Sequence, residues 1–208
     1  MCPEAHRHLS KVDPVLRALI RRVGPCTLSP KARTPFEALV SAVAHQQLNG
    51  TAAGTILKRF KRFSPNRRFP TPDDVDRLSD ETIRSAGFSR AKLAAIRDLA
   101  SRARSGALPP RKRLGGMEDE DVIACLTECR GVGRWTAEMF LMFTLGRPDV
   151  LPVDDFGIRN GFRLAYGLPE MPSPKELGSF GERWRPHRTT ASWYLWRAVD
   201  LAKQEASA

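Results

Sequence analysis

Asp154 and Asp155 are the residues of this sequence best placed for catalysis, because they are paired carboxylates at the start of an apolar run. They follow a loop punctuated by glycine and proline, from Gly146 to Pro152, and they precede a run that begins at Phe156. A carboxylate fixed at a helix start stabilises positive charge in a transition state or orients an attacking water. The alternative role is structural, because aspartate is also a common helix N-cap.

A tight glycine turn lies about twenty residues before these carboxylates. Gly131-Val132-Gly133 separates two amphipathic runs, 118–128 and 134–145, which predict a helix, a short turn and a second helix. Glycine allows left-handed dihedrals and a close backbone approach. The amides of the turn and of Arg134 lie at the start of the second helix, where unpaired N–H groups and the helix dipole favour an anion. A phosphate group is the expected ligand.

The charge of the chain indicates a polyanionic partner. Its 208 residues include 34 Lys and Arg against 23 Asp and Glu, a formal charge of +11, and the basic residues recur in short clusters along the whole chain. Each cluster alone is typical of a solvated face. Their sum favours nucleic acid over a membrane surface, because the chain has no long amphipathic basic helix and no apolar span of the roughly 18 residues that a membrane helix needs.

The four cysteines, Cys2, Cys26, Cys125 and Cys129, form neither a CxxC pair nor a disulfide framework. Cys125 and Cys129 lie one helical turn apart and could share a metal, but no His or further Cys is near them in the sequence, so apolar packing is favoured. The start, MCPEAHRHLS, lacks the apolar core of a signal peptide. We therefore expect a cytoplasmic protein, associated with the nucleoid if it is bacterial.

Helical periodicity and capping signals recur along the chain, whereas no alternating run long enough for a strand occurs. Asp13-Pro14 opens the first expected helix, Thr34-Pro35 the second, and Ser173-Pro174 a capping box near the end. The Pro/Gly/Arg-rich stretch 105–116 reads as a loop. The class is all-α. Helices are expected at 15–23, from 35 to about 44, and at 51–63, 80–86, 90–104, 118–128, 134–145, 156–166 and 190–203, with short helices after Thr71 and Ser173.

Three segments resemble the helix-hairpin-helix (HhH-GPD) DNA glycosylases, specifically the compact form of the 3-methyladenine DNA glycosylase II branch. They are the hairpin Leu126–Ala137 (LTECRGVGRWTA), the glycine and proline loop after it, and Asp155-Phe156-Gly157-Ile158. The resemblance covers roughly Thr34 to Leu201. It implies a two-lobed helical fold with the active-site cleft between the lobes. One lobe comprises residues 1–33 and 153–208, and the middle lobe comprises 34–152 with the hairpin at about 118–145.

The resemblance implies that Asp155 is the catalytic carboxylate, since it is in register with the aspartate of the family, and it leaves the capping role to Asp154. Relatives with glycosylase/lyase activity carry a nucleophilic lysine at the position of Trp135. Because Trp135 has no nucleophile, the chain resembles the monofunctional enzymes that use water. A Trp face is also a suitable wall for a flipped cationic base. The alternative for Trp135 is packing of the hairpin onto the core.

The resemblance implies further DNA contacts. Met139 and His187 stand at base-pocket positions where relatives can carry aromatic residues, although a surface position for His187 is the alternative. Gln47, with Leu48 beside it, stands where relatives insert a side chain into the gap left by the flipped nucleotide. A polar loop that ends the preceding helix is the alternative. The phosphate is expected at the amides of Gly131 and Gly133 and the hydroxyl of Thr136.

No catalytic cofactor is expected. In the family, main-chain carbonyls of the turn hold a monovalent cation, Na⁺ or K⁺, which bridges to DNA; they correspond to Thr127, Cys129 and Val132. Relatives of the endonuclease III type carry an iron–sulfur cluster on four C-terminal cysteines, but no cysteine follows Cys129.

The function that the resemblance implies is base excision repair by a monomer. The enzyme flips an alkylated purine of the 3-methyladenine or 7-methylguanine type out of duplex DNA, hydrolyses its glycosidic bond and leaves an abasic site. Two alternatives remain: a non-catalytic helix-hairpin-helix module that binds DNA, and a glycosylase/lyase that acts on oxidised bases.

Overall fold

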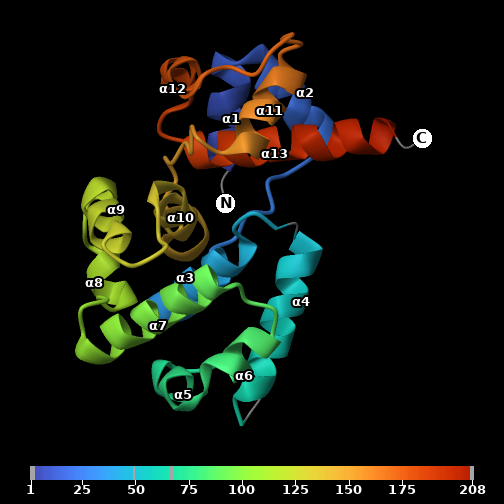
Figure 1. The fold of residues 1–208 in the computed structure, drawn as a ribbon. Coiled ribbons are helices and arrows are strands. Elements are labelled where there is room, and N and C mark those ends of the chain that lie inside the picture. The colour runs from blue at the N-terminus through green and yellow to red at the C-terminus, as the bar shows by residue number, and fades with distance from the viewer. Residues whose placement is uncertain (1–2, 49, 66–67, 207–208) are drawn as a thin grey trace. The chain divides into compact units, whose positions relative to one another are not determined.

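The computed structural model describes residues 3–48, 50–65 and 68–206, and every regular element within these ranges is a helix. The helices form two compact units (Figure 1). Unit 1 comprises Met1–Pro30 and Gly146–Ala208, and unit 2 comprises Lys31–Leu145. The predicted all-α class is confirmed.

The boundaries of the units differ from the expected lobes, which divided the chain after residues 33 and 152. The structure assigns the loop 146–152 to unit 1. The reason is a set of hydrogen bonds to the start of the last helix: the Val150 amide donates to the Thr189 hydroxyl at 3.0 Å, and the Thr189 amide donates to the Pro148 carbonyl at 3.0 Å. These long-range bonds leave no signal in the local sequence.

Unit 1 is built around its last helix. In this unit α13 packs against α2 and α11, and α1 packs against α2. A Cβ on Gly161 of α11 would lie 2.0 Å from the Leu195 carbonyl oxygen, so glycine permits the close approach of α11 to α13. The elements are α1 (Pro3–Val12), α2 (Pro14–Val23), α11 (Phe156–Ala165), α12 (Pro174–Gly181), the 3₁₀ helix η3 (Glu182–Trp184) and α13 (Arg188–Glu205).

The capping signals of unit 1 are confirmed, with one helix added. Asp13 caps α2, and Ser173 forms the predicted capping box of α12. Helix α1 was not predicted, because only Ala5 and Leu9 of it are buried and its apolar pattern is sparse. Helix α13 is buried over its first half, from Thr189 to Leu195, whereas its last turn is largely exposed.

Unit 2 surrounds α3, the second predicted helix. Its apolar positions, including Phe36, Leu39 and Val43, are buried, and α3 packs against α4, α7 and α10. The elements are α3 (Pro35–His45), α4 (Gly50–Phe60), the 3₁₀ helix η1 (Lys61–Phe63), α5 (Pro72–Arg77), α6 (Asp80–Ser85), α7 (Arg90–Ser105), α8 (Arg111–Gly115), α9 (Asp119–Thr127), α10 (Arg134–Phe140) and the π-helix η2 (Leu141–Leu145).

Two details of unit 2 correct the sequence analysis. The stretch 105–116 is not entirely a loop, because it contains α8, whose Leu114 is fully buried. The second hairpin helix is not α-helical to Leu145 but continues as the π-helix η2. Carbonyls of η2 are engaged outside the helix: Arg111 donates to the Thr144 carbonyl at 2.7 Å, and the Lys31 amide donates to the Phe143 carbonyl at 2.8 Å. Tertiary contacts therefore shape both segments.

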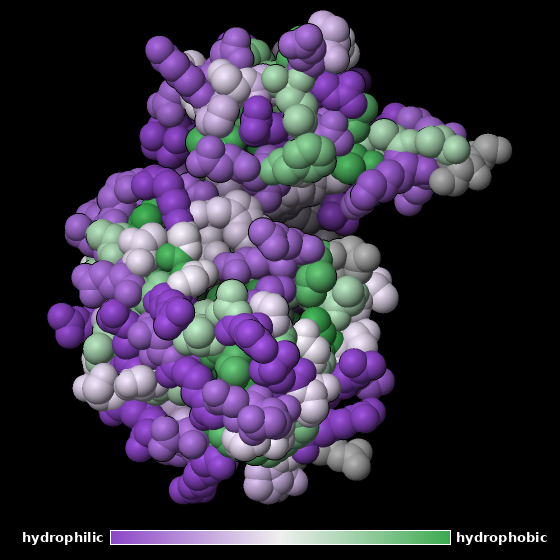
Figure 2. All heavy atoms as spheres, viewed as in Figure 1, coloured by the Kyte–Doolittle hydropathy of each residue, from purple (hydrophilic) through white to green (hydrophobic). Residues whose placement is uncertain are grey.

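Hydrophilic side chains predominate on the face drawn in Figure 2, with apolar residues scattered among them. Two large apolar side chains are exposed in the described part of the chain, Leu48 at 40% and Phe156 at 67%. Within the described residues we find no helix with the length and apolar character that crossing a bilayer requires.

Candidate active site

The hairpin joins α9 to α10 through a turn whose geometry requires glycine. Gly131 has a φ of +74°, and a Cβ there would lie 2.9 Å from the Cβ of Ala95 in α7. The turn is also tied to α7 by the Arg130 amide, which donates to Asp98 Oδ2 at 2.8 Å. The predicted helix–turn–helix is therefore present, and its turn packs against α7.

The start of α10 has a glycine N-cap followed by an arginine that is paired within the protein. Gly133 is the N-cap residue of α10, and as a glycine it makes no side-chain capping bond. Arg134, in contrast, donates to both carboxylate oxygens of Glu120, at 2.9 and 2.5 Å, and to Glu138 at 3.2 Å. The hydrogen bond and charge of Arg134 lower the pKa of Glu120. Two carboxylates thus compensate the charge of Arg134, a residue predicted to contact DNA.

The loop after α3 is fastened to the hairpin by residues that the sequence analysis did not identify. Gln46 Nε2 donates to the Gly131 carbonyl at 2.9 Å and to the Thr136 hydroxyl at 3.1 Å. Lys92 of α7 donates from Nζ to the carbonyls of Ala44, at 3.0 Å, and Gln46, at 2.9 Å. Thr136, predicted to contact a phosphate, is buried and has this internal partner.

The predicted wedge residues follow directly in that loop. Gln47 is exposed and has a φ of 56°, a left-handed value that residues other than glycine seldom adopt. Leu48 is 40% exposed, and its amide donates to the His45 carbonyl at 3.2 Å. Two side chains suited to fill a gap in a base stack are therefore presented to solvent, next to the hairpin of the same unit.

A pocket of about 330 Å³ lies beside these elements in unit 2, and Trp135 and Met139 line it together. They are one helical turn apart on α10, which places both on one face. The pocket lies within the usual range for small-molecule sites, roughly 300–1,000 Å³. Other lining residues come from α3, α10, η2 and the segment before α3, and include Lys31, Arg33, Ser41, His45, Phe140 and Phe143.

Asp155, in unit 1, is held by two donors. Its Oδ1 accepts from the Ile158 amide at 2.7 Å, as the N-cap of α11, and from the indole nitrogen of Trp196 in α13 at 2.9 Å. Gly157 leaves room for this indole, because a Cβ there would lie 3.0 Å from Trp196 Cδ1. The Asp155 carboxylate is half-buried.

The expected division of roles between the two aspartates needs a correction. Asp154 was assigned the capping role, but Asp155 is the N-cap residue and Asp154 is exposed. Capping and catalysis are compatible for one carboxylate, because the cap bond fixes its position. Trp196 was not identified from the sequence as a partner of Asp155, since the two lie 41 positions apart.

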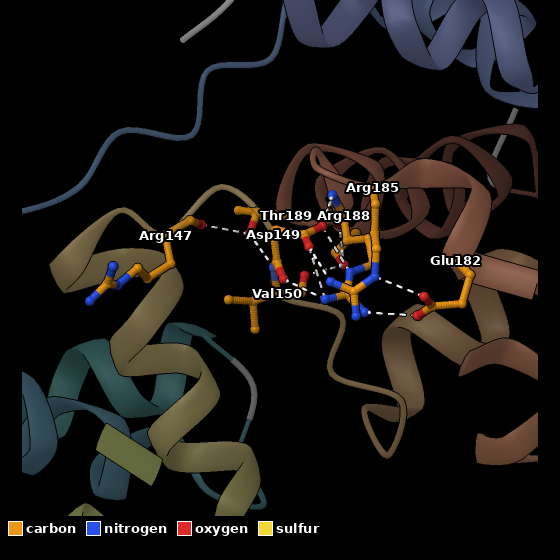
Figure 3. Close-up of polar contacts among 8 residues, drawn as sticks. Arg147, Asp149, Val150, Glu182, Arg185, Arg188 and Thr189 are labelled. Atoms are coloured by element: carbon orange, nitrogen blue, oxygen red, sulfur yellow. Dashed lines mark hydrogen bonds and ion pairs between the residues drawn. The ribbon is translucent and has the colours of Figure 1, made fainter. Parts of the chain in front are cut away.

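A polar network fixes the loop that precedes Asp155 (Figure 3). Arg188 donates from Nε to Asp149 Oδ1 at 2.8 Å and from Nη2 to Oδ2 at 3.0 Å, and Arg185 donates to Oδ2 at 2.7 Å. Partial burial would raise the pKa of Asp149, but the hydrogen bonds and charge of Arg188, together with the charge of Arg185, outweigh it and lower the pKa. The loop is thereby attached to the helix that carries Trp196.

His187 is in unit 1, whereas Trp135 and Met139 are in unit 2. It occupies the N-cap position of α13 without a side-chain capping bond, and its ring packs edge-to-face on His8 with centroids 5.4 Å apart. The ring is half-buried. The structure thus gives His187 a partner in α1, a helix that the sequence analysis did not predict.

The carbonyls expected to hold a cation belong to the end of α9 and the turn. The donor class fits, because carbonyls at a helix C-terminus lack intrahelical partners and hard monovalent cations prefer oxygen. Of the three carbonyls expected to bind the cation, that of Cys129 already accepts a hydrogen bond from the Val132 amide at 3.0 Å. The other two carbonyls are those of Thr127 and Val132. Burial raises the pKa of the Cys129 thiol to about 11, so this side chain is a neutral packing group.

The family comparison agrees with this geometry. Residues 40–186 match the model of the HhH-GPD superfamily of base excision DNA repair proteins. The chain is 39% identical over 201 residues to DNA-3-methyladenine glycosylase 1 of Schizosaccharomyces pombe, covering 96% of this chain and 88% of that protein. It is 35% identical over 202 residues to the alkylbase DNA glycosidase-like protein mag2 of the same organism, covering 96% and 95% of the two chains.

Solved structures show the same fold. The structure of S. pombe 3-methyladenine DNA glycosylase in complex with abasic DNA superposes with a TM-score of 0.89 at 39% identity, covering 93% of this chain and 95% of that one. DNA-3-methyladenine glycosidase from Bacillus halodurans gives a TM-score of 0.82 at 38% identity, covering 97% and 92%. The family predicted from the hairpin and the aspartate segment is confirmed. The chain belongs to the HhH-GPD superfamily of base excision DNA repair proteins.

Proposed function

We propose that the protein is a monofunctional DNA glycosylase that hydrolyses the N-glycosidic bond of alkylated purines in duplex DNA and leaves an abasic site. The observation that carries the proposal is the half-buried Asp155 carboxylate, held at Oδ1 by a helix amide and the Trp196 indole. Relatives at 35 and 39% identity, named as an alkylbase DNA glycosidase-like protein and a 3-methyladenine DNA glycosylase, support the choice of substrate class.

The carboxylate supplies the charge that the reaction needs. Breaking an N-glycosidic bond builds positive charge on C1′ and O4′ of the deoxyribose, and a carboxylate that is already oriented stabilises this charge without reorganisation. It also orients the water that attacks C1′. Alkylation at N3 or N7 makes the purine a good leaving group, so one carboxylate suffices. The oxygen of water forms the new bond to C1′ and the water loses one proton to solvent; the C1′–N bond breaks, and the cationic purine takes the bonding electron pair and leaves as a neutral base.

Trp135 decides between the subclasses. Its indole has no nucleophilic amine, so formation of a Schiff base with C1′ is not available and water is the nucleophile. Trp135 and Met139 line the pocket that we propose for the flipped base. Stacking of a cationic base on the Trp face adds about 0.5–2 kcal/mol to the binding free energy beyond apolar burial. This contribution favours alkylated, positively charged purines over neutral ones.

The hairpin and the loop after α3 would position the duplex. The amides of Gly131 and Gly133 bind a phosphate, and Gln47 and Leu48 fill the gap in the stack when the base leaves it, which offsets part of the few kcal/mol of unstacking. A monovalent cation on the carbonyls of Thr127, Cys129 and Val132 supplies a positive charge to the same phosphate. Double-stranded DNA is then the partner, and the protein acts as a monomer.

Release of free bases from methylated duplex DNA tests the proposal. Wild-type protein is incubated with the DNA, the released bases are separated by chromatography, and a parallel reaction contains borohydride. We expect methylpurines to be released and no covalent protein–DNA complex to be trapped. A trapped complex contradicts a monofunctional mechanism. Binding of duplex DNA without release of any base, across methylated, deaminated and oxidised substrates, contradicts the enzyme itself and supports a binding module.

A further inference from the structure

Two side chains outside the base pocket, those of Gln46 and Lys92, hold the loop 46–48. Gln46 donates to two acceptors of the hairpin, the Gly131 carbonyl and the Thr136 hydroxyl. Lys92 donates to two carbonyls at the end of α3, those of Ala44 and Gln46. Partial burial lowers the pKa of Lys92, so the ammonium has given up part of its hydration for these bonds.

These contacts bear on the conformation of the next residue, Gln47. Its φ of 56° lies in a region that side chains with a Cβ disfavour, and such a residue persists only where its surroundings determine it. Gln46, immediately before it, is fixed through its side chain by the hairpin and through its carbonyl by Lys92. The strained conformation is therefore imposed by neighbours and not by the loop sequence.

The same contacts join two elements that bind DNA in the proposed function. The Gly131 carbonyl belongs to the turn whose amides receive a phosphate, and Thr136 lies on α10, which also carries Trp135. Gln46 bonds both of them at 2.9 and 3.1 Å and carries Gln47 and Leu48 on the following positions. A phosphate bound at the turn and a wedge inserted in the stack thus have a fixed spacing before DNA arrives.

We infer that Gln46 and Lys92 are positioning residues for base flipping, which hold the Gln47–Leu48 loop on the hairpin in the conformation that enters the base stack. This inference rests on the proposed glycosylase function. A loop ordered in advance loses less conformational entropy when it binds, so the contribution is felt in the flipping equilibrium and not in bond cleavage. Neither side chain touches the reacting atoms.

Excision kinetics on two DNA substrates test the inference. Gln46→Met and Lys92→Met keep the size of each side chain and remove its donors. We expect about a tenfold lower kcat/KM on a lesion in a fully paired duplex, with most of the change in KM, and less than a threefold change on the same lesion in an unpaired bulge, where unstacking costs less. Equal losses on both substrates would mean that the residues only maintain the fold.

Three controls accompany these variants. Lys92→Arg keeps a charged donor and should recover most of the activity. Lys112→Met, on an exposed residue of α8, removes one positive charge elsewhere in unit 2 and should leave the ratio between the two substrates unchanged. In a Gln47→Ala, Leu48→Ala background, Gln46→Met should cause no further loss, because the group that it positions is absent. A further tenfold loss in that background contradicts the inference.

A readout without catalysis separates this inference from the proposed function. Amide hydrogen exchange of the free protein reports how firmly the loop is held, and the Leu48 amide, bonded to the His45 carbonyl, is the reporter. We expect exchange at Leu48 to become at least tenfold faster in Gln46→Met and Lys92→Met, with core amides of α3 unchanged. Unchanged Leu48 exchange overturns the inference even if the enzyme is active. Faster exchange in a protein that releases no base overturns only the proposed function.

Discussion

Two aspartates of unit 1 occupy similar local environments, and we propose different roles for them. Asp13 is the N-cap of α2 and accepts from the Trp184 indole at 2.8 Å, and Asp155 is the N-cap of α11 and accepts from the Trp196 indole at 2.9 Å. Asp13 is 1% exposed, and its Oδ2 also accepts from the Tyr166 hydroxyl. Asp155 is half-buried, and its Oδ1 also accepts from the Ile158 amide at 2.7 Å.

The difference shows that an N-cap and an indole bond do not by themselves mark a catalytic carboxylate. Both oxygens of Asp13 are used inside the protein, where they join α2, the end of α11 and η3. Burial and the bond to Asp13 raise the pKa of Tyr166, so its hydroxyl stays protonated as a donor. Asp155 retains contact with solvent, which a substrate needs. Exposure, and not the type of partner, distinguishes the two aspartates for which we propose these roles.

The largest expected effect is on catalysis at Asp155. Asp155→Asn should lower base release by about 100-fold or more, a loss comparable to removing one preorganised charge-stabilising group. Stability should change by less than about 1 kcal/mol, since asparagine is an equally good N-cap. Single-turnover base release and denaturant unfolding measure the two quantities on the same preparation. A stable variant with full activity contradicts the catalytic role.

The matched substitution at Asp13 should act on stability alone. Asp13→Asn places an amide opposite the buried donors of Trp184 and Tyr166, and we expect the free energy of unfolding to fall by about 2 kcal/mol. Base release per folded molecule should stay within twofold of wild type. Urea unfolding gives the first value, and activity normalised to the folded fraction gives the second. A loss of activity without a loss of stability would remove the distinction between the two aspartates.

The tryptophans that donate to these two aspartates extend the comparison, with smaller expected effects. Trp196→Phe removes the indole donor to Asp155, and we expect base release to fall about tenfold. This loss is about 1.4 kcal/mol, close to the lower end of the roughly 1.5–3 kcal/mol of one hydrogen bond to a charged group. Trp184→Phe removes the equivalent donor to Asp13 and should lower stability by a similar amount without affecting turnover. Single-turnover rates and unfolding curves of both variants provide the test. Equal effects of the two variants on turnover would contradict it.

Asp149 should give the smallest effect, visible in the pH dependence of stability. Its pKa in the folded protein is lowered, so its contribution is present above the ordinary aspartate pKa of about 3.9 and is lost as the pH falls through the lower folded value. Asp149→Asn should therefore be less stable than wild type at pH 7, and the two unfolding free energies should converge in acid. A difference that is independent of pH would show that the ionised form is not responsible.

Local sequence was sufficient for much of the fold. Caps at Asp13, Thr34, Thr71 and Ser173 and the periodic apolar positions of α3 are short-range signals, and the structure has a helix at each. Helix α8 was not predicted, because its stability depends on burial of Leu114 and on the bond from Arg111 to the Thr144 carbonyl, 33 positions away. Such partners cannot be assigned from one sequence.

The candidate site divides in the same way. The glycine turn, Trp135 and Asp155 lie in a continuous stretch whose spacing is readable. The residues that hold this stretch are distant in the sequence. Trp196 lies 41 positions from Asp155, and Gln46 lies 85 positions from Gly131. Lys92, which holds Gln46, lies 46 positions from it. Candidate catalytic residues can be predicted from a single sequence, whereas the residues that orient them are identified only once the packing of the helices is known.

Affinity for a charged analogue tests the central claim most directly. Duplex DNA carrying a cationic pyrrolidine in place of the damaged nucleotide imitates the positive sugar of the transition state, and a neutral tetrahydrofuran abasic site is its uncharged counterpart. Equilibrium Kd values are measured for both with wild type and Asp155→Asn. If Asp155 stabilises the developing charge, wild type should prefer the cationic site by about tenfold or more, and the preference should disappear in Asp155→Asn while binding to the neutral site is retained. A preference of equal size in both proteins would show that the carboxylate does not perform this role.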